Sequence, residues 1–312
     1  MREARVRKGH AVLRGVVTLA ATGATCLATA LPGHAAPTFR AVQTFQASPA
    51  PARPHAPTPV RGFSQHQWLT AEQGVPHPLA VTVLDGSGLL AVADRPGGRT
   101  RITLLDPARD RVVGRMRVAG VRATRTLADD GHGTLAVLAG RELLTWPASA
   151  RGTVRPHATR VAGTLPARTA GMSWDPAAHG WLVLDAADHR LLRLTAGHGH
   201  LRASGGPGLG TPAGARLRGV AVDAASGLAY VGTARGRLYE VTGTGHVRRT
   251  FTVAGDRGAA TLASGPSADP TDPAGLTSLY TAAAGSTAGS DPALGRVSEL
   301  SLTPLGSAAA LA

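Results

Sequence analysis

The sequence has one cysteine, Cys26, one lysine and no asparagine, and aromatic residues make up only 4% of its 312 residues. A single cysteine can form neither an intramolecular disulfide bond nor a thiolate metal site. We therefore expect an ordinary packed hydrophobic core to stabilise the chain. After Leu31 the sequence also lacks any segment that is long and apolar enough to cross a bilayer.

The first 35 residues have the order of a secretory signal peptide. A basic segment that ends at Arg14 precedes an uncharged run from Gly15 to Leu31. Gly33 and Ala35 are small residues at the two positions that a signal peptidase requires for cleavage after residue 35. We expect residues 1–35 to be removed and the remaining chain, which would lack cysteine, to be secreted. An uncleaved membrane anchor is the alternative.

Arginine supplies almost all of the positive charge. The chain carries 33 Lys and Arg residues against 19 Asp and Glu residues, a formal net charge of +14. Loss of residues 1–35 would leave 28 basic and 18 acidic residues, a net charge of +10. Such a balance favours anionic partners. The scarcity of lysine and asparagine is equally typical of a GC-rich coding bias, so charge alone does not establish anion binding.

Residues 36–61 contain six prolines among alanines and threonines, with little regular apolar spacing. This composition predicts an extended linker or a disordered mature N-terminus. The folded domain is then expected over residues 62–312.

An internal repeat of about 47 residues runs through this domain. In each unit an aspartate is followed, three to five residues later, by a glycine that opens a β-favouring run. These glycines, at intervals of 45, 47, 47 and 48 residues, are Gly88, Gly133, Gly180, Gly227 and Gly275. Asp followed by Gly is typical of a tight hairpin turn, because Asp can bond its own backbone and Gly accepts a positive φ.

Further strands are predicted on both sides of this turn. First strands precede it at residues 79–84, 123–128, 170–174 and 217–222. Arginine-led third strands begin at Arg101, Arg141, Arg190, Arg237 and Arg296. Fourth strands follow in most units, for example at residues 112–118, 201–204 and 247–253. No helical periodicity lies between them, so each unit is predicted to be a four-stranded antiparallel meander.

Repetition of this unit predicts an all-β fold, a β-propeller of five blades, with six blades as the alternative. In the fifth unit, the residues after Leu302 have a composition that disfavours an outer strand. The segment Phe63–Leu69 has a strand-like composition and could pair into the last blade. Closure of the ring by this N-terminal strand would remove the exposed edges of an open sheet.

With turns such as Asp175–Leu184 and Asp223–Val231, the chain resembles the broad group of NHL, YVTN and WD-repeat-like β-propellers over about residues 62–302. This resemblance implies an architecture, and it implies that the first strand of each blade lines a central channel. It implies no activity, because the fold hosts lyases, lactonases, quinoproteins and binding scaffolds. The polar residues of the channel strands would be Thr82, Arg125, Thr126, Ser173, Arg218 and Thr261.

No cofactor or metal is expected. Gluconolactonase-type propellers use an asparagine among their metal ligands, and this chain has no asparagine. Quinoprotein propellers carry repeated tryptophan motifs, whereas the four tryptophans of this chain do not recur at the repeat spacing. The chain has no G-x-S-x-G elbow, no H-E-x-x-H motif and no phosphate loop. His198-Gly199-His200 lacks carboxylates nearby and is interpreted as a surface loop. Because the channel strands offer no acidic or His–carboxylate pair, an enzyme is the weaker hypothesis.

The arginines that lead the third strands form the candidate binding site, because a closed ring would place all of them near one rim. Neighbouring loops add further polar groups. The candidate ligand-binding residues are Arg95, Arg99, Arg101, Arg141, Asp185, His189, Arg190, Arg235, Arg237 and Arg296. Converging guanidinium groups could bind carboxylate, sulfate or phosphate bidentately. The alternative is that each arginine solvates a loop edge or pairs with an aspartate.

The sequence thus predicts a secreted or cell-surface-associated, monomeric binding scaffold. Its expected partner is an anionic surface polymer, an acidic protein or a small anion, with nucleic acid less favoured and no membrane contact after signal cleavage. The alternative function is a hydrolase or lyase that acts on a small polar substrate at the channel mouth. Asp94, Asp185 and His189 would be its candidate residues.

Overall fold

A computed structural model describes the chain from Pro59 onward, with gaps. The described residues are 59–122, 124, 126–162, 165–166, 168–197, 200–253, 261–268, 277–283 and 295–301. They all belong to one compact unit, Val42–Ala312. The predicted signal peptide, most of the predicted linker, and the turn of the fifth repeat unit with Asp272 and Gly275 lie outside them. Within the described part of the chain, no helix has the length and hydropathy needed to span a membrane.

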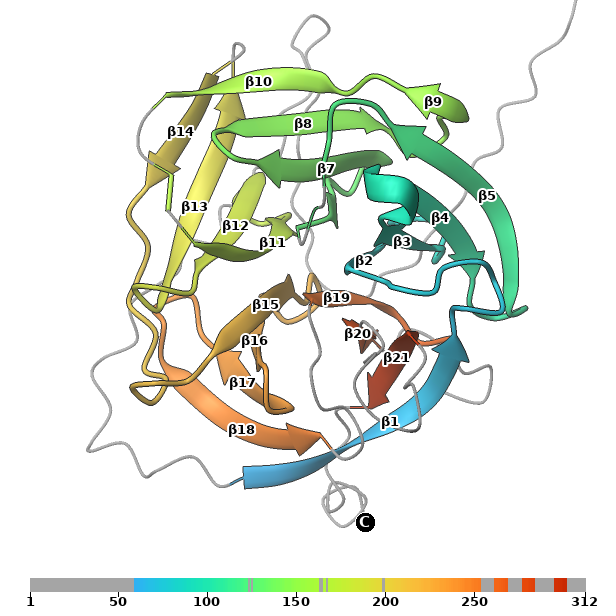
Figure 1. The fold of residues 1–312 in the computed structure, drawn as a ribbon. Coiled ribbons are helices and arrows are strands. Elements are labelled where there is room, and N and C mark those ends of the chain that lie inside the picture. The colour runs from blue at the N-terminus through green and yellow to red at the C-terminus, as the bar shows by residue number, and fades with distance from the viewer. Residues whose placement is uncertain are drawn as a thin grey trace, which may run out of the picture. The chain divides into compact units, whose positions relative to one another are not determined.

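The described residues form an all-β structure with one 3-10 turn, η1 (Pro96–Gly98). The first four blades appear in Figure 1 as successive antiparallel meanders. The first contains β2 (Ala80–Val83), β3 (Leu90–Asp94), β4 (Arg101–Asp106) and β5 (Arg111–Val118). The second contains β6 (Ala128–Asp129), β7 (Thr134–Ala139), β8 (Glu142–Pro147) and β10 (His157–Ala162). The third contains β11 (Thr169–Asp175), β12 (Gly180–Asp185), β13 (Arg190–Gly197) and β14 (His200–Ser204). The fourth contains β15 (Leu217–Val222), β16 (Ala229–Thr233), β17 (Arg237–Val241) and β18 (Val247–Val253).

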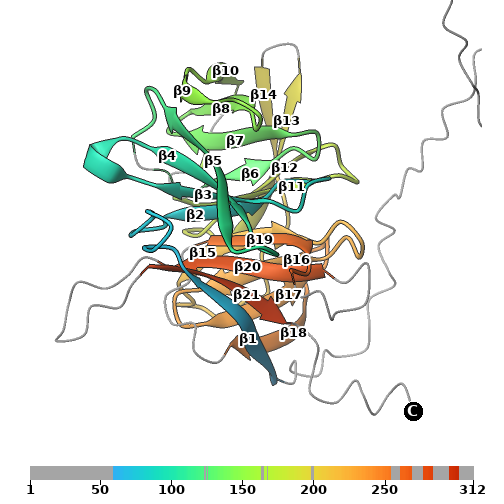
Figure 2. The same ribbon diagram turned by 90° about the vertical axis from the view of Figure 1, so that its right-hand side faces the viewer.

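The fifth blade combines strands from both ends of the domain. It contains β19 (Thr261–Pro266), β20 (Thr277–Ala283), β21 (Arg296–Ser301) and the N-terminal strand β1 (Pro59–Leu69). β1 pairs antiparallel with β21, with Phe63 opposite Ser301 and Leu69 opposite Arg296 (Figure 2). The predicted use of Phe63–Leu69 to complete the last blade is therefore confirmed. The strand begins at Pro59, so it also includes the last residues of the predicted linker.

The blades form a closed ring. Their innermost strands β2, β6, β11, β15 and β19 contact one another in this cyclic order, and β19 returns to β2. Five hydrophobic clusters among the described residues each join two neighbouring blades, including one between the fifth and the first. The predicted β-propeller is therefore confirmed, with its core divided among the blade interfaces.

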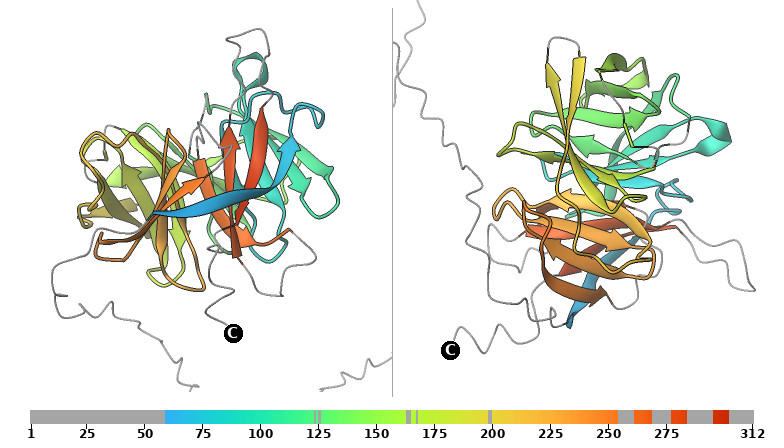
Figure 3. Two further views of the ribbon diagram at one scale, coloured as in Figure 1. Left: turned by 90° about the horizontal axis from the view of Figure 1, so that it is seen from below. Right: turned by 90° about the vertical axis from the view of Figure 1, so that its left-hand side faces the viewer.

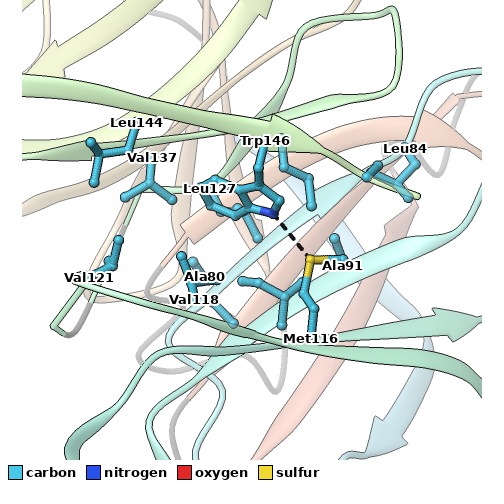
Figure 4. Packing of buried hydrophobic residues seen from close by; sticks show 14 residues of the cluster. Ala80, Leu84, Ala91, Met116, Val118, Val121, Leu127, Val137, Leu144 and Trp146 are labelled. Atoms are coloured by element: carbon cyan, nitrogen blue, oxygen red, sulfur yellow. Dashed lines mark hydrogen bonds between the residues drawn. The ribbon is translucent and has the colours of Figure 1, made fainter. Parts of the chain in front are cut away.

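The cluster between the first and second blades shows how an interface is built (Figure 4). Trp146 of β8 reaches across from the second blade, and its indole N–H donates to Sδ of Met116 in β5 at 3.2 Å. Leu127 and Val137 pack in the same cluster. The polarisable sulfur thus gives the buried indole a polar partner in an otherwise apolar contact.

The aspartate–glycine turns form as their residue types predict. Asp130 Oδ1 accepts the backbone N–H groups of His132 and Thr134 at 2.8 and 3.0 Å. Gly88, Gly133 and Gly227 have φ values of 64°, 78° and 67°. In the third unit His179, with φ 47°, adopts the left-handed conformation in place of a glycine.

The predicted first strand at residues 123–128 is wrong in extent, because β6 covers only Ala128–Asp129. The Thr126 hydroxyl accepts the N–H of Leu138 at 3.1 Å and donates to its carbonyl at 3.3 Å. The Thr124 hydroxyl likewise bonds the backbone of Thr126. Threonine side chains therefore take the bonds that a regular strand would make through its backbone.

Parallel pairs cover several outer edges, a feature that the sequence pattern did not predict. β9 (Gly152–Val154) pairs parallel with β5 of the first blade, and β10 pairs parallel with β14 of the third. β1 continues past β21 to pair parallel with β18 of the fourth blade (Figure 3, left). These additions satisfy backbone groups that would otherwise present an open sheet edge.

Two glycines allow the innermost strands to approach closely. Gly171 of β11 and Gly219 of β15 each lie four residues before the aspartate of their turn. A Cβ atom on Gly171 would lie 2.7 Å from the backbone nitrogen of Val220, and one on Gly219 would lie 2.7 Å from that of Leu262. Glycine is therefore required here by contact between neighbouring blades rather than by a turn.

We predict that Gly219→Ala lowers the free energy of unfolding by about 2–3 kcal/mol, because an added methyl group must push two backbones apart. Urea unfolding followed by tryptophan fluorescence measures this loss. Gly114→Ala in β5 is the matched control, since its Cβ would meet only the Leu104 side chain at 3.5 Å. Equal stabilities of the two variants would show that the inner strands are not tightly packed.

Candidate functional site

A cavity of about 440 Å³ lies where the innermost strands end and their first hairpin turns begin. All five blades contribute to its lining among the described residues. The lining residues are Thr82, Val83, Asp85, Ala128, Asp129, Gly131, His132, Met172, Ser173, Trp174, Pro176, His179, Val222, Ala224, Leu262, Ala263, Ser264, Gly265, Pro266 and Thr277. The volume falls in the range of small-molecule sites.

Apolar side chains make up much of the cavity wall. Val83, Met172 and Leu262 come from three different blades, and each is buried. Trp174 is half-buried and packs edge-to-face on Trp181, with ring centroids 4.8 Å apart and an interplanar angle of 66°. The cavity therefore offers apolar contact and one aromatic side chain held in place by a second ring.

Gly131 separates the tryptophan from a carboxylate. A methyl group on Gly131 would lie 3.4 Å from Nε1 of Trp174 and 3.6 Å from Oδ2 of Asp85. The small residue thus keeps the space between these two polar atoms open.

Asp129 places a second carboxylate in the cavity wall, and its two oxygens are used differently. Oδ2 accepts the backbone N–H of Asp85 at 2.9 Å. Oδ1 is buried and has no hydrogen-bond partner among the described residues, although the residue is only 6% exposed. A buried carboxylate oxygen without a donor is energetically unfavourable.

Burial is the main cause of a raised pKa for the Asp129 carboxyl. The neighbouring carboxyl groups of Asp130 and Asp85 raise it further, whereas the hydrogen bond from the Asp85 backbone and the nearby backbone N–H of Gly131 lower it. The carboxylate form is therefore stabilised less than it would be in water, and a donor at Oδ1 would stabilise it.

The bond from Asp85 to Asp129 belongs to a set that links neighbouring inner strands. The Val81 N–H donates to Thr261 Oγ1 at 3.1 Å, and the Val222 N–H donates to Ser173 Oγ at 3.0 Å. Each bond joins the innermost strands or first turns of adjacent blades. The bond to Oδ2 of Asp129 thus helps to close the ring, whereas Oδ1 makes no such bond to the described residues.

The remaining ionisable groups at the cavity are Asp85, His132 and His179, and all three are exposed. No arginine or lysine lines the cavity in the described part of the chain. In a protein with 33 basic residues, the wall of this cavity thus presents two carboxylates beside two imidazoles. A grouping of three His, Cys, Asp or Glu residues suited to a metal ion was not found in the ranges that the structure describes.

The arginines predicted as a binding rim lie elsewhere. They start the third strands, after the second turn of each blade, so they belong to the opposite end of the strands from the cavity. Arg95, Arg99, Arg141, Arg190, Arg235 and Arg237 are exposed, and Arg101 and Arg296 are half-buried. The structure gives the positions of these residues. That they bind an anion together stays a prediction.

Some of these side chains have defined partners. The Arg101 guanidinium forms an ion pair with the buried carboxylate of Asp94 and also donates to the Gly74 carbonyl. Arg190 Nη2 donates to the Gly206 carbonyl at 3.1 Å. These contacts hold loops and strand ends together within the domain.

The residues proposed for catalysis also have local partners. Asp185 is buried, and its Oδ1 accepts the N–H groups of Ala187 and Asp188 at 3.0 and 3.3 Å. His189 Nδ1 lies 2.9 Å from Thr211 Oγ1. Asp185 thus shapes its turn in the way that the repeat aspartates shape theirs.

The sequence pattern assigned the aspartate before Gly88, which is Asp85, to turn formation, and it selected neither Asp129 nor His132. One signal was present: Asp129 and Asp130 are adjacent at the first turn of the second unit, and a single turn needs only one of them. Asp130 makes the turn bonds, which leaves Asp129 for the cavity.

The chain matches no family model and no curated protein. Among solved structures it is similar to the Cps50 (Swd1) β-propeller domain of Myceliophteria thermophila at a TM-score of 0.40 and 14% identity, covering 66% of this chain and 62% of that one. It thus spans less than two thirds of the Swd1 domain's length. It is also similar to a luciferin-regenerating enzyme at a TM-score of 0.44 and 14% identity, covering 72% of this chain and 78% of that one.

We predict that Asp129→Asn raises the melting temperature at pH 7. The raised pKa means that the native state loses stability as the pH rises through it, whereas asparagine does not ionise. The asparagine carbonyl keeps an acceptor for the Asp85 N–H. Below the ordinary aspartate pKa of 3.8 both states of the wild type hold the proton, so the difference should shrink there.

Thermal unfolding of both proteins from pH 3 to pH 8 checks this expectation. A variant that is less stable than the wild type at pH 7, by the same amount at every pH, would contradict it.

Proposed function

We propose that this protein is a binding propeller whose ligand is a small organic cation, an amine with an apolar or aromatic body. The observation that carries this proposal is Oδ1 of Asp129, a buried acceptor in the cavity wall that has no donor among the described residues. An ammonium group could supply that donor and the opposite charge together.

Local charge favours a cation at this site even though the whole chain is basic. At physiological ionic strength charges are screened beyond about 8 Å, so the groups that line the cavity outweigh distant arginines. Those groups include Asp85 and Asp129 and no permanently positive side chain among the described residues.

The rest of the cavity supports an apolar ligand body. Val83, Met172 and Leu262 provide buried apolar contact, and Trp174 provides an aromatic surface or edge. Burial of an apolar group here contributes about 25 cal/mol for each Å² removed from water. Recognition would therefore combine one charged anchor with an apolar contact, as is common in small-molecule sites.

The compartment is part of the proposal. The basic segment, apolar run and small-residue cleavage site at the N-terminus support export of the domain. A secreted propeller with a cation-binding cavity would act as a ligand-binding scaffold outside the cytoplasm. The expected anionic partners would bind a different surface, because the cavity presents carboxylates.

We predict that the protein binds 2-phenylethylamine about ten- to a hundredfold more tightly than 2-phenylethanol, which has the same apolar body without the charge. 3-Phenylpropionate should bind most weakly, because its carboxylate meets those of Asp85 and Asp129. Saturation-transfer NMR and calorimetry with these three probes give the order. Binding of the amine should weaken as the pH falls and Asp129 takes up a proton.

Asp129→Asn should abolish the preference for the amine over the alcohol while the alcohol affinity stays the same. Asp188→Asn is the matched control, since it removes the same charge from an exposed residue near the opposite end of the strands. If both variants lose the preference equally, long-range charge and not the cavity explains it. If the wild type binds amine and alcohol alike, the proposed ligand class is wrong.

A further inference from the structure

We propose a second binding site, for a phosphate or sulfate group, in a cleft at the outer side of the first blade. The cleft has a volume of about 560 Å³ and is lined by residues of the η1 turn, the end of β5, the loop that follows and β9. Its lining includes Arg99, Arg117 and Arg122 and no acidic residue in the described part of the chain. This site is independent of the central cavity.

The three arginines come from separate segments, so the fold brings them together. Arg99 follows η1, Arg117 lies in β5, and Arg122 lies in the loop toward the second blade. All three side chains are exposed, and no ion pair of theirs is seen among the described residues. Arg95 adds a fourth guanidinium nearby, since a methyl group on the lining residue Gly98 would lie 4.0 Å from its Nη2.

Thr100 fixes the backbone that carries these arginines. It is 1% exposed, and its hydroxyl donates to the Arg122 carbonyl at 2.7 Å. Its carbonyl accepts the Val118 N–H at 2.9 Å. Thr100 and Val118, which follow Arg99 and Arg117, are thereby bonded to each other, and Thr100 is also bonded to the Arg122 backbone, so the cleft is preorganised.

The register of the first blade leaves positive charge uncompensated at this place. Arg117 is the cross-strand partner of Arg101, and like charges opposite each other are destabilising. Asp94 neutralises Arg101 through an ion pair, whereas the cleft offers Arg117 no carboxylate. An anion bound between Arg99, Arg117 and Arg122 would compensate the charge of Arg117.

The chemistry of the donors selects the ligand class. Guanidinium groups present paired N–H donors that match two oxygens of a phosphate or sulfate group. Several such groups around one cleft suit a tetrahedral oxyanion with three or more oxygens. The same group could be a free anion or could be carried by a polymer.

The test measures binding of inorganic phosphate and sulfate to the full chain by calorimetry at constant ionic strength, with acetate as a comparison. Phosphate and sulfate should compete for one site and bind more tightly than acetate. Arg117→Ala/Arg122→Ala should weaken phosphate binding at least about tenfold. Arg202→Ala is the control, because Arg202 is an exposed arginine on β14 of another blade.

A second variant separates a built site from general attraction. Arg117→Lys/Arg122→Lys keeps the net charge and loses the paired donors, so phosphate binding should still weaken severalfold. Full phosphate affinity in this variant, or an equal loss in Arg202→Ala, would overturn the proposal. A polyphosphate chain that binds more tightly per phosphate than inorganic phosphate would assign a polymer as the source, and equal binding would assign a free anion. Amine binding in the central cavity should be unchanged in all of these variants, so either site can fail alone.

Discussion

Contact between the innermost strands is the constraint on which the rest of this ring depends. Each of these strands has one edge that pairs within its blade and one that faces a neighbouring blade. Gly171 and Gly219 let adjacent backbones come close, and single side-chain oxygens of Thr261, Asp129 and Ser173 accept backbone N–H groups across the gap. These bonds satisfy donors that would otherwise be lost from water. The hydrophobic clusters between the blades then supply most of the stabilisation.

The candidate site follows from this way of closing the ring. A threonine or serine hydroxyl completes the bond between two other pairs of strands, but at Asp129 a carboxylate does so. A carboxylate carries one oxygen more than the bond needs and a charge that burial disfavours. A residue that served only to close the ring would be better chosen as Thr, Ser or Asn. The presence of an aspartate here is explained if its second oxygen binds a ligand.

The two candidate sites differ in charge. The cavity end presents Asp85 and Asp129, whereas the cleft at the other end of the first blade presents Arg99, Arg117 and Arg122. Because both sets sit on turns and strand ends supported by paired strands, the scaffold can hold opposite charges at separate sites. A basic chain can therefore have one cationic and one anionic ligand.

Much of the fold could be predicted because the repeat uses residues with strong local preferences. Asp130 and Asp223 make their turn bonds as expected, and the strand material at Phe63–Leu69 was recognised from its composition. The short β6 was missed because the hydroxyls of Thr124 and Thr126 replace backbone bonds, which no hydrophobic period reveals. The parallel pair of β1 with β18 joins residues about 190 apart in sequence, so it too could not be predicted from a local pattern.

The candidate site was harder to predict than the fold. Arg101 led a repeated strand and was therefore selected, yet its guanidinium pairs with Asp94 of its own blade. Asp129 repeats in no other blade and gains its role only from burial beside Asp85. Repetition marks residues that build the blade, whereas a site of this kind is marked by departure from the repeat.

The most direct measurement is the pKa of Asp129, followed through its carboxyl carbon by ¹³C NMR with and without 2-phenylethylamine. If Asp129 binds the ammonium group, the pKa of its buried carboxyl should lie above the ordinary aspartate value of 3.8 in the free protein. That pKa should fall when the amine binds. A carboxyl that titrates at its ordinary value and does not respond to the amine would contradict the account.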